Sequence, residues 1–265
     1  STHLVTSRHL YGFESDYDEC FSFVTDHELS KHRMPDGITY HDAMLFDIAS
    51  EVLRKTKNGP FFLHVMTEST HHPWPIDPKL PAFGNGENHV LTAYHQTDIS
   101  IKKLFDTFFA LGLNRNTVFI ITADHAMPFT GGKYVSGNVD RIPLVFRFPD
   151  GCGIRGKNSV TCTPLDIAPT ILHLAGINGE NNFEGESLFG KTHSGVQLSL
   201  MLSFDLVARS KGRIADISRE KVKKMNNTDL PVFPDEKVTY KDLFLYMKLM
   251  SNLDYYGTPM KVRRK

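Results

Sequence analysis

A short apolar run that ends in two ionisable residues constrains the fold of this chain more than any other feature. Val118 to Ala123 holds five apolar residues out of six and is rich in β-branched side chains, a composition typical of strands. Because the run is nearly continuous rather than alternating, it predicts a strand buried on both faces, as in a parallel sheet. The run stops abruptly at Asp124 and His125.

Asp124 and His125 are candidate metal ligands because of where the predicted strand leaves them. In open α/β sheets, sites form beyond the carboxyl ends of strands. A carboxylate and an imidazole there can both reach one divalent cation. The alternative is a polar strand exit that only hydrogen-bonds a loop, and the dipeptide taken alone favours that simpler interpretation.

A second apolar run, Phe61 to Thr67, leads into another group of chemically capable residues. The segment that follows contains His71 and His72 and then Trp74, which lies between two prolines. Prolines hold such a loop extended. An imidazole binds an anionic oxygen when protonated or a metal when neutral. The alternative is a pair of loop histidines stacked on the tryptophan.

The apolar patterns predict alternating helices and strands. Helical spacing begins near Tyr40 and again near Glu87, and the segments should stop before Gly59 and at Gly112, respectively. The order strand, helix, strand from Phe61 to Ala123 predicts a βαβ unit with parallel strands. Further elements are a strand within 141–149, a helix within 163–174 that Pro169 interrupts, a strand at 198–207 and a helix at 240–249.

These elements predict an α/β fold, with a mostly parallel central sheet flanked by helices. A chain of 265 residues that is 40% hydrophobic can bury a sizeable core. Thirty basic and thirty acidic side chains balance, so no electrostatic attraction to nucleic acid is implied. No run is long enough to cross a membrane, and no signal peptide is visible. The chain begins with Ser1, which is compatible with a processed product or a fragment.

Three cysteines are too few for a disulfide framework. Cys152 and Cys162 flank a short basic segment and would pair if they faced each other across a hairpin. Two free thiols are an equally good interpretation.

Taken in order, the motifs resemble the sulfatase-like branch of the alkaline phosphatase superfamily, and within it the lipoteichoic acid synthase and phosphoglycerol transferase type. The resemblance covers about residues 10–190. Each motif is weak alone, and the specificity comes from their order. The matching pieces are Pro60 to Leu63 with Thr67, His71 to Trp74, Tyr94 with Asp98, Asp124-His125, Arg141 to Leu144, Asp166 to Leu172 with Ala175-Gly176, and Glu184 to Leu188.

The resemblance implies an alkaline-phosphatase-like α/β sandwich that hydrolyses or transfers a sulfate or phosphate ester with a divalent cation, whether Mn²⁺, Mg²⁺, Ca²⁺ or Zn²⁺. By position, Asp124 and His125 match metal ligands. His71 matches the histidine that holds the substrate's oxygens, and His72 is the less favoured neighbour. Lys133 is a further substrate-binding candidate, although its spacing to Arg141 is imperfect.

The chain also departs from the family pattern. The usual glycine after Asp-His is Ala126, and the nucleophile and the other acidic ligand would precede residue 10. We therefore expect residues 1–190 to be the C-terminal two-thirds of a catalytic domain and 191–265 an extension packed on it. The alternative is a degenerate, non-catalytic member that binds or scaffolds. A Ser-His-Asp hydrolase is disfavoured because no Gly-x-Ser-x-Gly elbow is present.

The resemblance further implies a small-molecule, lipid-headgroup or glycan ester as substrate, with no nucleic acid partner. Such domains work outside the cytoplasm or at a membrane. Membrane association of this chain would then require an N-terminal segment that it lacks. Sulfate and phosphate esters both remain open as substrates.

Overall fold

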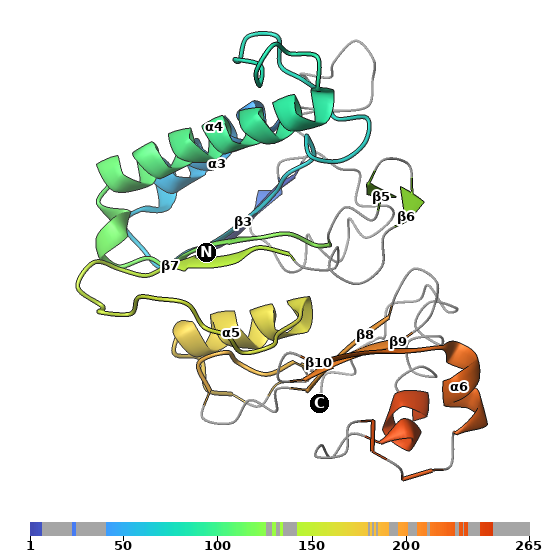
Figure 1. Cartoon of the computed structure of the whole chain (residues 1–265). Coiled ribbons are helices and arrows are strands. Elements are labelled where there is room, and N and C mark those ends of the chain that lie inside the picture. The colour runs from blue at the N-terminus through green and yellow to red at the C-terminus, as the bar shows by residue number, and fades with distance from the viewer. Residues whose placement is uncertain are drawn as a thin grey trace. The chain divides into compact units, whose positions relative to one another are not determined.

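The computed structural model describes most of residues 1–6, 41–125, 142–190 and 217–245, together with the backbone of several short strands elsewhere (Figure 1). Within these ranges the gaps are residues 180, 182, 184, 226–227, 230 and 233–238, and the residues from 246 onward also lie outside the described part. The chain divides into two compact units, Ser1–Ile154 and Arg155–Lys265.

The first unit is built on a parallel βαβ arrangement. Strand β1 (Thr2–Thr6) pairs in parallel with β2 (Phe23–Val24) on one side and with β3 (Phe62–Met66) on the other. Helix α3 (Asp42–Thr56) connects β1 and β3 in the sequence. No strand was predicted before Tyr40, so the apolar patterns missed β1. Its five residues are too few to show a period, although Leu4, Val5 and Thr6 are fully buried.

The parallel arrangement predicted for the strands at 61–67 and 118–123 is not seen among the described strands. Strand β4 (Phe119–Thr122) pairs antiparallel with β7 (Leu144–Arg147). Among the described strands it has no parallel partner. It is only partly buried, and Thr122 is exposed, so the expectation of burial on both faces was wrong. The described strands form four small sheets. A single, mostly parallel central sheet is therefore not what they show.

The core of the first unit lies where α3 meets α4 (His89–Ala110) and β1. Apolar residues of α3 recur at helical spacing, so one face of the helix is buried. Phe119 of β4 stacks on Phe105 of α4 at 4.3 Å between ring centroids, joining the second sheet to the helix. The buried core residues are Val5, Leu45, Phe46, Ala49, Val52, Leu53, Leu104, Phe108 and Leu113.

Both ends of α4 follow from local chemistry, as the sequence predicted to within two residues. The side chain of Asn88 caps the first turn by accepting a hydrogen bond from the Leu91 amide at 3.0 Å. After the helix, Gly112 takes a positive φ of 71°. Glycine adopts this left-handed conformation without steric cost, which ends the helix.

The second unit combines a helical part with a small antiparallel sheet. A 3₁₀ turn (Pro164–Asp166) runs into α5 (Ile167–Leu174), so Pro169 lies in the first turn of α5 rather than at its start. The sheet has the order β10-β9-β8, from strands Arg213–Ile217, Leu206–Ser210 and Val196–Leu200. The single strand expected at 198–207 is therefore two strands. Helix α6 (Arg219–Lys224) follows, and residues 240–245 are helical as predicted.

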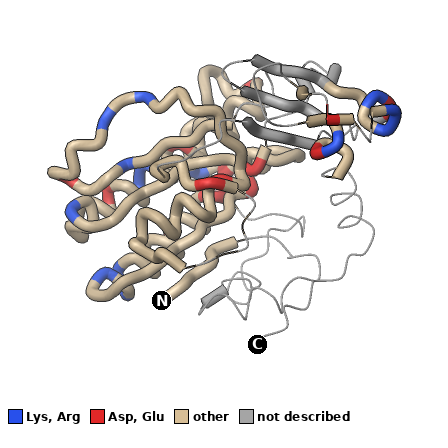
Figure 2. The backbone as a smooth tube through the Cα atoms, turned by 90° about the horizontal axis from the view of Figure 1, so that it is seen from below, with Lys and Arg blue, Asp and Glu red and all other residues tan. Residues whose placement is uncertain are grey.

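Charge and thiol chemistry agree with the composition. Basic and acidic positions are interspersed along the described backbone (Figure 2). Cys152 and Cys162 are both free thiols, which settles the question of their pairing. Among the described residues, no helix has the length and apolar character needed to span a bilayer.

Candidate active site at the ends of β3 and β4

The loop after β3 is a tight, well-bonded turn. The amide of His71 donates to the Glu68 carbonyl at 2.9 Å, and the amide of Trp74 donates to the His71 carbonyl at 2.7 Å. The His72–Pro73 peptide bond is cis, and Trp74 has a φ of 57°. That value is uncommon for an aromatic residue, and such conformations cluster at functional sites.

The ring of His71 is oriented by its own loop. Its Nδ1 lies 2.7 Å from the carbonyl oxygen of His72. Because a carbonyl oxygen can only accept, Nδ1 must carry the hydrogen and donate. The Glu68 carboxylate lies on the same side, 4.0 Å from Nδ1. The side chain is 54% exposed, so Nε2 is the atom that the loop offers to a ligand.

His72 and Trp74 contact each other instead of pointing at His71. Their rings meet edge to face, with centroids 5.0 Å apart at an interplanar angle of 74°. The alternative predicted histidines stacked on Trp74, whereas His72 meets the tryptophan ring edge to face. Of the two histidines, His71 therefore has the geometry of a ligand-binding group, and His72 has a packing contact.

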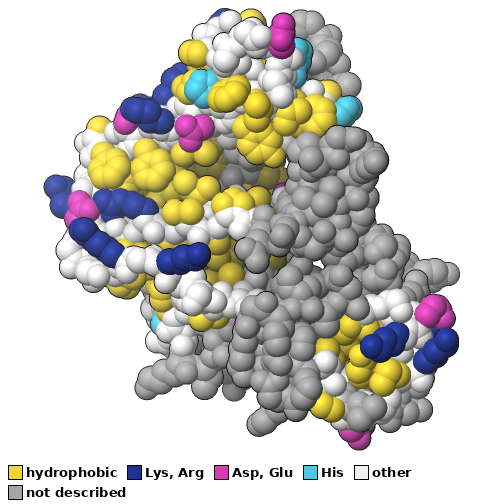
Figure 3. All heavy atoms as spheres, viewed as in Figure 1, with side chains coloured by type: hydrophobic (Ala, Val, Ile, Leu, Met, Phe, Trp, Pro, Cys, Tyr) yellow, Lys and Arg dark blue, Asp and Glu magenta, His cyan; other side chains and the backbone are white. Residues whose placement is uncertain are grey.

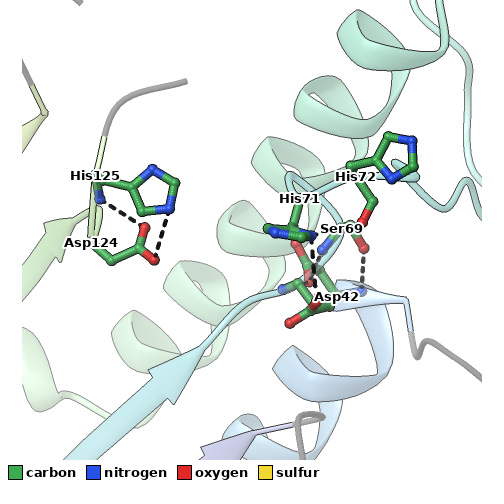
Figure 4. A network of polar contacts seen from close by, with 7 residues as sticks. Asp42, Ser69, His71, His72, Asp124 and His125 are labelled. Atoms are coloured by element: carbon green, nitrogen blue, oxygen red, sulfur yellow. Dashed lines mark hydrogen bonds and ion pairs between the residues drawn. The ribbon is translucent and has the colours of Figure 1, made fainter. Parts of the chain in front are cut away.

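Asp124 and His125 form a compact pair at the end of β4 (Figure 4). The His125 amide donates to Asp124 Oδ1 at 2.8 Å, and His125 Nε2 lies 3.5 Å from Asp124 Oδ2. Both side chains are largely exposed, 82% for Asp124 and 65% for His125. An exposed carboxylate beside an imidazole supplies one oxygen and one nitrogen donor for a cation.

The donor chemistry of this pair fits a divalent metal, but the pair is only part of a coordination sphere. Metal sites of this kind use three or four protein ligands. Over the described ranges, no group of three or more His, Cys, Asp or Glu side chains is arranged to hold a metal. Asp124 and His125 therefore offer two donor atoms for a cation, and no third donor of this kind joins them among the described side chains.

The two clusters come from different strands. In Figure 4 the His71 loop rises from the end of β3, while Asp124 and His125 sit at the end of β4. Lys133 lies in the short strand β6 (Lys133–Tyr134), which pairs with β5 (Phe129–Thr130). Its side chain is outside the described part, as are all atoms of Arg141 and Ala126.

Sequence reasoning missed a buried acidic anchor beneath the His71 loop. Asp42 is 2% exposed, and its carboxylate accepts hydrogen bonds from the amides of Glu68 and Ser69 and from the hydroxyl of Thr97. Asp42 was not among the residues that the motifs marked as candidates for the site. Nothing in a single sequence shows that its partners lie 26, 27 and 55 residues away.

The N-terminal half of α4 holds the next stretch of the same loop. The Gln96 side chain accepts from the Asp77 amide at 2.9 Å and donates to the carbonyl oxygens of Asp77 and Leu80. The predicted family pair, Tyr94 and Asp98, lies on the exposed side of this helix. Apolar and histidine side chains gather on the surface of this end of the unit (Figure 3).

Known proteins resemble this chain in both sequence and structure. Lipoteichoic acid synthase 1 of Bacillus subtilis is 33% identical over 156 residues, which are 51% of this chain and 24% of that protein. A Vibrio parahaemolyticus protein of the alkaline phosphatase superfamily superposes with a TM-score of 0.66 at 19% identity, covering 82% of this chain and 54% of that one. Lipoteichoic acid synthase LtaP from Listeria monocytogenes gives 0.58 at 18% identity, covering 95% and 69%.

These similarities confirm the α/β fold and the resemblance seen in the motifs. The chain spans about a quarter of the length of the Bacillus subtilis relative. The family model described as Sulfatase matches residues 1–177. Because that match covers more than half of the chain, the chain belongs to the sulfatase family.

Proposed function

We propose that this chain forms part of an enzyme that hydrolyses or transfers a sulfate or phosphate ester with the help of a divalent cation. The observation that carries this proposal is that the chain belongs to the sulfatase family and has an Asp-His pair at the end of β4. An oriented, exposed histidine follows another strand and supports the same proposal. Family membership supports ester chemistry, and the motif positions support the assignment of roles.

Each residue has a distinct task in this proposal. Asp124 and His125 hold the cation, which, when bound, neutralises negative charge on the ester oxygens. His71 keeps Nδ1–H on the His72 carbonyl, so a proton on Nε2 is directed at an oxygen of the transferred group. The Glu68 carboxylate lies 4.0 Å from Nδ1, on the side of the ring that faces its own loop. His72 and Lys133 are weaker substrate-binding candidates.

The substrate class follows from the relatives. A lipoteichoic acid synthase relative supports a phosphate ester of a lipid headgroup, and the sulfatase family match supports a sulfate ester of a small molecule or glycan. We place the activity outside the cytoplasm or at a membrane, by analogy with such enzymes. We assign residues 1–190 to the catalytic domain, because the family match covers residues 1–177 and the amides of Glu186 and Leu188 are bonded to side chains of Asp166 and Thr170 within the matched part.

The test compares Asp124→Ala with Asp106→Ala, a matched control. Asp106 is also exposed but pairs with Lys102 within α4. Mn²⁺ affinity is measured by titration, together with turnover of nitrophenyl phosphodiester and nitrophenyl sulfate. Loss of a ligand should weaken Mn²⁺ binding by more than the roughly 10- to 100-fold that outer-sphere substitutions cost, while Asp106→Ala should match the wild type. Unchanged Mn²⁺ affinity in Asp124→Ala would remove Asp124 from the site.

A non-catalytic binding role is the second candidate, favoured by Ala126 where the family has glycine. In that case the chain binds phosphate or sulfate but turns over neither ester with any divalent cation. Turnover that depends on Asp124 rules this candidate out.

A further inference from the structure

Asp42 is the one buried acid among the described residues of the first unit. Its Oδ1 accepts from the amides of Glu68 at 2.8 Å and Ser69 at 2.9 Å. Its Oδ2 accepts from the Thr97 hydroxyl at 2.6 Å. Its own amide donates to the Ser69 hydroxyl at 3.0 Å, so Asp42 and Ser69 are bonded reciprocally.

Such a carboxylate needs a reason to be buried, because removing it from water is costly without full compensation. Helix capping is not that reason. His41 is the N-cap residue, and the first helical residue, Asp42, turns its carboxylate to the loop after β3. Three donors and the positive end of the α3 dipole compensate its charge. One carboxylate thereby joins α3, the loop after β3 and α4.

The two amides that Asp42 binds begin the turn that carries His71. The turn closes when the His71 amide donates to the Glu68 carbonyl at 2.9 Å. The side chain of Glu68 also faces the His71 ring. The bonds from Asp42 to the amides of Glu68 and Ser69 therefore hold the start of the turn that carries the His71 ring. Asp42, Ser69 and His71 lie together in Figure 4.

We infer that Asp42 is a positioning residue for His71, which holds the loop after β3 in the conformation that presents Nε2 to a sulfate or phosphate group. This inference rests on the proposed function, because it assumes that His71 binds such a group. Asp42 itself touches no substrate in this account. It acts by holding the loop through hydrogen bonds, and its negative charge plays no part in binding the sulfate or phosphate group.

The variants separate positioning from stability and from charge. Asp42→Ala removes every bond made by the carboxylate. Asp42→Asn can keep them, since its amide oxygen accepts from the loop and its amide nitrogen donates to Thr97. Val52→Ala is the stability control, because Val52 is buried in the core on the same helix and its side chain is far along α3 from the loop. His71→Gln tests the ligand role directly.

The measurement is a titration of the chain with inorganic phosphate and with sulfate, followed by NMR of the ring of His71. Asp42→Ala should weaken phosphate and sulfate binding by about tenfold. This is the lower end of the effect expected when a group that orients a ligand-binding side chain is lost. Asp42→Asn should bind within about threefold of the wild type, and Val52→Ala should bind like the wild type although it melts earlier.

Thr97→Val keeps the proposal testable if Asp42→Ala does not fold. It deletes one donor to Asp42 and preserves shape, so it should weaken phosphate binding by a few-fold with only a small change in melting temperature.

The outcomes distinguish the two proposals. Normal binding in folded Asp42→Ala, or in Thr97→Val if the former does not fold, overturns the positioning role while His71→Gln still fails to bind. Phosphate binding that survives His71→Gln overturns the proposed function, and the positioning role falls with it.

Discussion

At the scale of single residues, buried aspartates organise the loops of both units. The Asp42 carboxylate accepts hydrogen bonds from the Glu68 and Ser69 amides in the loop after β3. In the second unit Asp166, also 2% exposed, accepts the amides of Thr163 and Glu186 at 2.8 Å each. A carboxylate can accept several amide hydrogen bonds at once, so one side chain can define a loop that its own sequence leaves undetermined.

The reactivity of Cys162 follows from this arrangement. Burial, and then the negative charge of Asp166, raises the pKa of the Cys162 thiol above its ordinary value. A higher pKa means less thiolate at any given pH, and thiolate is the reactive form. Iodoacetamide should therefore modify exposed Cys152 faster than Cys162 at pH 8. The rate of modification of Cys162 should increase further between pH 8 and pH 9.5. Mass spectrometry of peptides checks both rates, and equal rates at pH 8 would contradict the assignment.

At the scale of elements, helices were more predictable from sequence than strand partners. The apolar faces of α3 and α4, the breaker at Asn58-Gly59-Pro60 and the stop at Gly112 are local signals, and all three agree with the structure. Strand pairing is not local. The five residues of β1 carry no detectable period, so the parallel partner of β3 was missed and β4 was given that role.

The loop that contains Gly185 should be intolerant of a side chain. A Cβ at this position would overlap the carbonyl oxygen of Leu165. Backbone at Leu165 cannot swing aside as a flexible side chain would, so Gly185→Ala should cost about 1–3 kcal/mol in the free energy of unfolding. Gly179→Ala is the matched control, because a Cβ there meets nothing within 4 Å. Chemical denaturation measures both, and equal stability of the two variants would show that the loop adapts.

Gln96 should control the second half of the loop after β3. Gln96→Leu would leave the Asp77 amide and the carbonyl oxygens of Asp77 and Leu80 without this partner. We expect a loss of about 1–3 kcal/mol in unfolding free energy and faster hydrogen exchange at the Asp77 amide. The control is Ser100→Ala, one turn along α4, whose hydroxyl bonds only back to the Gln96 carbonyl of its own helix. Unchanged exchange at Asp77 in Gln96→Leu would refute the role.

At the scale of the whole molecule, two compact units share one chain. In the first unit, α3 and α4 pack around a core with Phe108 and Leu104 at its centre, 1% and 3% exposed. Leu104→Ala should cost about 2–5 kcal/mol in the unfolding free energy of that unit. Thermal unfolding followed by tryptophan fluorescence reports on it directly, because Trp74 is the only tryptophan of the chain. A melting temperature equal to that of the wild type would contradict the assigned core.

The order of motifs along the sequence predicted the family and the α/β class, because both depend on many weak signals spread over the chain. The site was predictable only in part. His71, Asp124 and His125 are visible as reactive residues after apolar runs. The groups that bond to the His71 ring and to its loop, the His72 carbonyl and the Asp42 carboxylate, are partners that only the folded chain identifies.

The central claim is that the ends of β3 and β4 serve one ester-binding site, and ³¹P NMR of inorganic phosphate with Mn²⁺ tests it most directly. We predict that the chain broadens the phosphate signal beyond the broadening that the same Mn²⁺ concentration causes without protein, that Asp124→Asn removes this excess by losing the cation, and that His71→Gln removes it by losing the anion. Excess broadening that persists in both variants would contradict the claim, because phosphate and cation would then meet somewhere else on the protein.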